Sequence, residues 1–99
     1  MTVTEDFVDD KLVLSVEGRI ETNTAPEFQS AVLGAFQKSS NVVIDFEEVA
    51  YISSAGLRGL LLGHKTAMSK GGSMVLNNVN DAVLEVFKMT GFINILTIQ

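Results

Sequence analysis

Two adjacent hydroxyl side chains, Ser53 and Ser54, are the residues of this chain whose type and position best suit chemistry. They follow a stretch that is predicted to be a buried strand, residues 41–46, and they open a stretch that is predicted to be an amphipathic helix. The unpaired N–H groups at the start of a helix and the positive end of its dipole favour an anion there. We therefore expect that a phosphate on either hydroxyl leaves the helix folded.

Serine is also a preferred helix N-cap residue, and from local sequence alone capping is the favoured role for Ser53 and Ser54. The two roles are compatible, because a phosphate adds about −1.5 to −2 charge beside the same N–H groups. Asp45, Glu47 and Glu48 lie just upstream and would repel the phosphate if they are near it in space. We expect phosphorylation to change the surface potential more than the fold.

The sequence offers no catalytic constellation around these serines. His64, the one histidine, lies ten residues after Ser54 on the same predicted helix, roughly 15 Å along its axis, so the two cannot form a nucleophile and base pair. The chain has no cysteine and a single histidine, a composition that argues against a transition-metal site. The run at residues 71–73 follows a helix and precedes a strand, the wrong order for a phosphate loop. We expect neither enzymatic activity nor a cofactor or metal.

Hydrophobic periodicity predicts the elements that position the serines. Strands are expected at residues 3–8, 11–17, 41–46, 74–76 and 93–98, with an acidic two-residue turn between the first two. The strand at 41–46 is apolar without strict alternation, which is typical of a strand covered on both faces. Three helices are expected. The first begins at Thr24, with Glu27 at capping-box spacing, the second begins at the serines, and the third begins after Asn80.

This order of elements predicts an α/β fold, with a mixed but mostly parallel sheet of four to five strands packed with three or more helices. An antiparallel hairpin is expected at one edge. The chain is expected to be one domain, residues 1–99, because 99 residues suit a single modest core. Met68, Met74 and Met89 are expected to fill that core, and His64 to lie on a helix surface.

Composition limits the classes of partner. A net charge of −5, with only seven Lys and Arg residues, disfavours direct binding to nucleic acid. The acidic start lacks the features of a secretory leader, and no apolar run approaches the roughly 18 residues that span a bilayer. A soluble cytoplasmic protein without membrane insertion is the expectation.

Residues 51–58, Tyr-Ile-Ser-Ser-Ala-Gly-Leu-Arg, resemble the motif of the anti-sigma-factor antagonists, the stand-alone bacterial form of the STAS domain. The resemblance extends over nearly the whole chain, since residues 12–21, 24–28, 71–76 and 83–92 are similar to further ordered pieces of that family. It implies a STAS-like fold over residues 1–99.

The resemblance also implies the site residues. In many members the phosphorylated serine follows an aspartate, and alignment on Gly56 puts Ser53 at the aspartate position and Ser54 at the phosphoacceptor. Ser54 is the predicted phosphorylation site and Ser53 the second choice. The partner-binding surface that the resemblance implies comprises Glu21, Thr22, Asn23, Ser53, Gly56, Leu57 and Arg58. Arg58 is expected to pair with a partner carboxylate or with the phosphate.

The function that the resemblance implies is a phosphorylation-controlled switch in transcription regulation and signal transduction. The unmodified protein would bind an anti-sigma factor with serine-kinase activity and release a sigma factor. That kinase would phosphorylate Ser54, and a serine phosphatase of the metal-dependent type would restore binding. Two alternatives remain open at this point, a constitutive STAS-domain accessory subunit of a membrane transport or other signalling complex, and a small-ligand-binding or enzymatic role that needs a polar-lined pocket.

Overall fold

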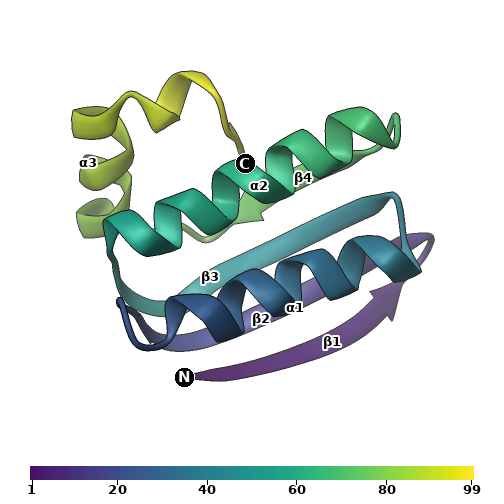
Figure 1. Ribbon diagram of the computed structural model, residues 1–99, viewed down its shortest axis with the longest axis horizontal. Helices are drawn as coiled ribbons and strands as arrows, with labels where there is room; N and C mark the ends of the chain where they lie inside the picture. The colour runs from purple at the N-terminus through teal and green to yellow at the C-terminus, as the bar shows by residue number, and fades with distance from the viewer.

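The sheet has five strands in the order in which they occur along the chain, and the computed structural model describes all 99 residues (Figure 1). Strand β1 is antiparallel to β2, and every other neighbouring pair is parallel. This confirms the predicted mixed sheet with a hairpin at one edge. The strands are β1 (Thr2–Val8), β2 (Lys11–Ile20), β3 (Asn41–Ile52), β4 (Ser73–Asn77) and β5 (Thr97–Ile98). The helices are α1 (Ala25–Lys38), α2 (Ser54–Ser69), α3 (Asp81–Thr90) and the short 3₁₀ helix η1 (Phe92–Asn94).

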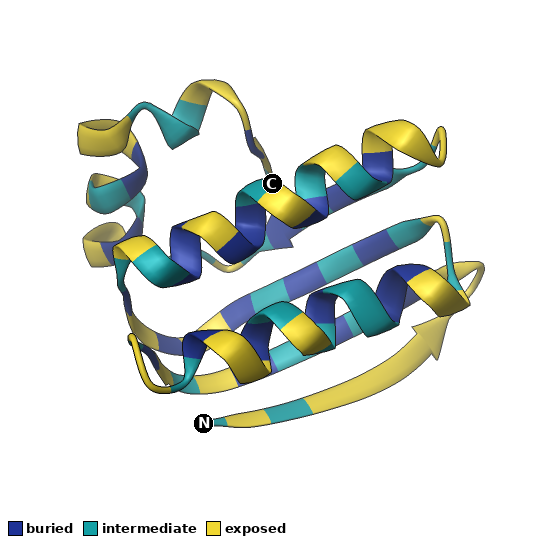
Figure 2. Ribbon diagram, viewed as in Figure 1, coloured by how far each residue is buried: buried dark blue, intermediate teal, exposed yellow.

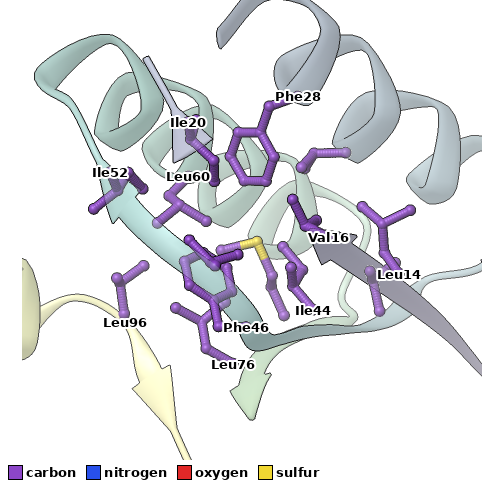
Figure 3. Packing of buried hydrophobic residues seen from close by; sticks show 14 of the residues in the cluster. Leu14, Val16, Ile20, Phe28, Ile44, Phe46, Ile52, Leu60, Leu76 and Leu96 are labelled. Carbon is purple, nitrogen blue, oxygen red and sulfur yellow. The ribbon is translucent and has the colours of Figure 1, made fainter. Parts of the chain in front are cut away.

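All three α-helices pack on one face of the sheet. Successive parallel strands are neighbours, and crossover connections of constant hand put every connecting helix on the same side. Phe46 on β3 contacts Phe28 of α1 edge-on at 6.4 Å between ring centroids, and Phe87 of α3 at 6.3 Å. Figure 3 shows such side chains from strands and helices meeting in one layer. The core of 22 buried hydrophobic residues therefore lies between the sheet and its single helical layer.

The other face of the sheet is not covered by helices. Burial alternates over residues 41–46 of β3, so that Val42 and Ile44 are buried while Val43 and Asp45 are only partly buried (Figure 2). The prediction that this strand is covered on both faces is therefore wrong. Its apolar run reflects half-buried valines on the open face, where Val43 has Val13 and Val75 as its neighbours in register.

Two further expectations are corrected by the packing. Met74 is buried, but Met68 and Met89 are 68% and 79% exposed, because they lie on the outward faces of their helices. The last strand is Thr97–Ile98 rather than residues 93–98. The N–H groups of Asn94 and Ile95 donate to the carbonyls of Gly91 and Phe92, so that segment forms a 3₁₀ turn before it reaches β4.

Helix α3 begins as predicted, and its N-cap residue, Asn80, is tied to the sheet. The Asn80 side-chain oxygen accepts from the Val83 N–H at 2.9 Å, and its amide donates to the Val49 carbonyl of β3 at 2.8 Å. One side chain therefore both caps the helix and joins it to the strand that leads to the serines.

Replacement Asn80→Ala is expected to lower the free energy of unfolding by about 2 kcal/mol, because it removes both a helix cap and a hydrogen bond to β3. Asn80→Asp keeps a capping oxygen and loses only the donor, so it is expected to cost about half as much. Urea unfolding followed by circular dichroism measures both variants. Equal losses in the two would contradict the assigned role of the cap.

Candidate functional site

The two loops that follow β2 and β3 lie side by side at the end of the sheet where these two strands finish. Ile20 and Ile52, the last residues of these parallel strands, are paired in register. The Ser53 N–H then donates to the Ile20 carbonyl at 2.8 Å, which extends the pairing by one bond beyond β3. At the left of Figure 1, the chain leaves the ends of β2 and β3 and turns into α1 and α2 respectively. The loop at residues 21–24 is thereby held next to the serines.

Ser53 is the N-cap of α2. Its backbone is extended, with φ −91° and ψ 173°, and its hydroxyl oxygen accepts from the Gly56 N–H at 3.3 Å. Its carbonyl accepts from the Leu57 N–H at 2.9 Å. The residue is half-buried. Ser53 therefore holds the start of the helix through its side chain and its main chain.

Ser54 differs from its neighbour in each of these respects. It is the first residue of α2, it is exposed, and its hydroxyl has no hydrogen-bond partner within the protein. The first turn of the helix contains no acidic residue. The hydroxyl is thus open to an enzyme, and the helix dipole favours an anion at this position.

The loop beside the serines is organised by Thr24. The Thr24 hydroxyl accepts from the Glu21 N–H and donates to the Arg19 carbonyl, each at 2.8 Å. Thr24 makes no side-chain cap bond to α1, so the predicted capping box with Glu27 is wrong. The hydroxyl is used instead to close the loop, which leaves Thr22 and Asn23 exposed at its tip.

The Glu21 carboxylate is only partly available to a partner. It accepts from Arg19 Nε at 3.1 Å, and the Arg19 guanidinium lies 4.7 Å from the centre of the Tyr51 ring. Arg19 and Tyr51 are register partners on β2 and β3, and Tyr51 is 40% exposed. Neither residue was predicted as part of the site. Their proximity depends on two irregularities in the β2–β3 register, which the sequence does not reveal.

Gly56 and Leu57 lie beneath the site rather than on its surface. Both are buried, and a Cβ at Gly56 would stand 2.6 Å from Ile20 Cγ2 and 2.7 Å from Ile52 Cγ1. Their part in partner binding stays a prediction, and for Gly56 it is the predicted close approach of a partner to the backbone. They let α2 approach the ends of the two strands. Of the predicted helix residues beyond the serines, Arg58 is the exposed one.

Asp45, the first of the three upstream acidic residues, lies far from Ser54. Asp45 precedes Ile52 by seven strand residues, about 23 Å at 3.3 Å per residue. Its carboxylate accepts from the Asn78 side chain at 3.1 Å and from the Glu47 N–H at 2.9 Å. Asp45 therefore contributes little repulsion to a phosphate at Ser54.

The remaining candidates do not form a second site. His64 is half-buried on α2, ten residues beyond Ser54. No group of three His, Cys, Asp or Glu side chains has the geometry to hold a metal ion.

None of the helices combines the length and the apolar character that crossing a membrane requires.

Comparison with known proteins identifies the family. The family model described as Mlab, STAS domain, matches residues 3–97. BtrV of Bordetella bronchiseptica, a candidate anti-sigma factor antagonist, is 32% identical over 99 residues, which cover 99% of this chain and 85% of the relative. The anti-sigma-B factor antagonist of Listeria monocytogenes is 30% identical over 92 residues, which cover 91% of this chain and 80% of the relative.

Solved structures agree in fold. A candidate anti-sigma factor antagonist from Thermotoga maritima superposes with a TM-score of 0.89 at 23% identity, covering 97% of this chain and 84% of that one. Bacillus SpoIIAA in its phosphorylated form gives 0.74 at 15% identity, covering 99% and 91%. The chain belongs to the STAS domain family. Its named sequence relatives are anti-sigma-factor antagonists, which favours that class over a transport accessory subunit.

Replacement Gly56→Ala is expected to lower the free energy of unfolding by about 1–3 kcal/mol, because the added methyl group overlaps two buried isoleucines. Gly34→Ala is the matched control. Nothing lies within 4 Å of a Cβ at that helical position, so this change should be neutral or stabilising by up to about 1 kcal/mol. Chemical unfolding of both variants provides the measurement, and a Gly56→Ala variant as stable as Gly34→Ala would contradict the packing role.

Proposed function

We propose that this protein is an anti-sigma-factor antagonist whose binding to an anti-sigma factor is controlled by phosphorylation of Ser54. The observation that carries the proposal is the contrast between the two serines. Ser54 is exposed with a free hydroxyl at the first position of α2, whereas Ser53 is half-buried and engaged in capping. The names of the sequence relatives supply the class of partner.

In this proposal the chain is the substrate of its partner and catalyses nothing itself. An anti-sigma factor with serine-kinase activity transfers the γ-phosphoryl group of ATP to Ser54 Oγ. ADP leaves, and the hydroxyl proton passes to a base of the kinase. A metal-dependent serine phosphatase hydrolyses the ester and regenerates the hydroxyl. The chain itself needs no cofactor, and we infer that it acts in the cytoplasm with these partners.

The proposed docking surface surrounds the Ser54 hydroxyl. It comprises the exposed loop tip at Thr22 and Asn23, the accessible part of Glu21, and Arg58 one turn along α2. The packing of Gly56 and Leu57 supports this surface from below. Because the loop is closed by Thr24 and the helix by Ser53, the surface is organised before a partner arrives. Such preorganisation reduces the entropy that binding costs.

Phosphorylation in this scheme acts through charge and bulk rather than through refolding. Ser54 Oγ makes no internal hydrogen bond that a phosphate would break, and no acidic residue lies in the first turn of α2. SpoIIAA has been solved in unphosphorylated and phosphorylated forms, and this fold superposes on them with TM-scores of 0.75 and 0.74. Both forms therefore share the overall fold of this chain.

Replacement Ser54→Asp is expected to weaken binding to the anti-sigma factor at least tenfold, because it puts a negative charge at the centre of the docking surface. The probes are the purified ATPase-fold anti-sigma factors of the organism that makes this protein, and titration calorimetry measures their affinity. Ser69→Asp, which makes the same charge change at the far end of α2, should bind like the wild type. Equal affinities for wild type and Ser54→Asp would count against the switch.

The two serines are expected to respond differently to a kinase. With ATP and the purified partner, Ser53→Ala should still acquire one phosphate, while losing about 1 kcal/mol of stability through its cap. Ser54→Ala should acquire none. Intact-mass spectrometry with peptide mapping follows both reactions. Phosphate on Ser54→Ala together with an unmodified Ser53→Ala would assign the site to Ser53 instead.

A further inference from the structure

Helix α2 is basic in an acidic protein. The chain carries twelve acidic and seven basic residues, yet α2 contains Arg58 and Lys65 and no Asp or Glu. The protein has two ion pairs, Arg19 with Glu21 and Lys38 with Glu5, so neither cation of α2 is neutralised by a neighbour. Both side chains are exposed. Two unpaired cations are thus held on one helix.

These cations line a groove between α1 and α2. Two adjoining hollows of the surface share Gln29 and Arg58. One extends toward the docking surface and includes Thr22 and Ala55, and the other extends along α2 past Leu62 to Lys65. No carboxylate lines either hollow. Leu62 is 36% exposed, which adds an apolar contact between the two positive charges.

Arg58 is also the residue that connects this groove with Ser54. The two residues are four apart on α2, which puts them on the same helix face with Cβ atoms about 5–6 Å apart. An anion that precedes a cation by four residues is the favourable orientation for such a pair. A guanidinium binds phosphate oxygens through two parallel N–H bonds, and no internal carboxylate competes for it.

We infer that the α1–α2 groove binds an acidic segment of the partner, and that phosphate on Ser54 releases this segment by capturing Arg58. The inference rests on the proposed function and extends its docking surface along α2. In the unmodified protein, Arg58 and Lys65 pair with carboxylates of the partner while Leu62 contacts an apolar side chain between them. After phosphorylation, the guanidinium turns to the phosphate on its own helix. The end of the groove nearest Ser54 then changes from positive to negative.

The capture of Arg58 is testable on the protein alone. Phosphoserine is incorporated at position 54 by genetic-code expansion, and the phosphate is titrated by ³¹P NMR in wild type and in Arg58→Gln. The nearby guanidinium is expected to lower the second pKa of the phosphate by about 0.3 relative to the variant at low salt. The difference should disappear near 1 M NaCl, where the screening length is about 3 Å. Equal pKa values at low salt would overturn the capture.

The groove is tested by reversing the charge of single lysines of this protein. The affinity of each variant is measured for the anti-sigma factor that binds the unmodified wild type. Lys65→Glu is expected to weaken that complex about tenfold. The control is Lys88→Glu, which makes the same change at an exposed position of α3 and should leave affinity unchanged. Equal affinities of the two variants would overturn the groove assignment while leaving the Ser54 switch intact. If no anti-sigma factor binds the wild type, the proposed function fails and the groove assignment with it.

Discussion

The geometry of the site is determined by the parallel pairing of β2 with β3. The pairing runs to the ends of both strands, at Ile20 and Ile52, and the hydrogen bond from the Ser53 N–H to the Ile20 carbonyl extends it by one more bond. It brings together two segments that are about thirty residues apart in sequence, and it fixes the point at which α2 begins. Gly56 completes the arrangement, because a larger residue would push α2 away from the two isoleucines. The exposure of Ser54 follows from this packing and from the capping by Ser53.

The proposed switch needs no large conformational change in this arrangement. The docking surface rests on a core whose contacts do not include the Ser54 hydroxyl. A phosphate there would therefore alter charge and shape at the surface while the interior stays packed. Arg58, which lines both hollows of the α1–α2 groove, would extend that effect from the helix start into the groove.

Most of the fold could be predicted from sequence, because period-two and period-3.6 patterns report local burial. The hairpin and the three helices follow from such patterns, and the caps at Ser53 and Asn80 follow from the residue types that are preferred at helix starts. Sequence patterns mislead where tertiary contacts decide the structure. The valines of β3 do not reveal that its second face is open, and the Thr24 hydroxyl closes a loop rather than capping α1. Likewise, the groove at Arg58 and Lys65 depends on the pairing of two helices, which sequence spacing alone does not give.

The most direct test of the central claim is mass spectrometry of the protein isolated from its own cells, grown with and without stress. The expected result is a phosphate on the peptide that contains Ser53 and Ser54, localised to Ser54, whose occupancy changes with the conditions. A peptide that stays unmodified under every condition, in cells where the antagonist is active and its partner kinase is present, would contradict the account.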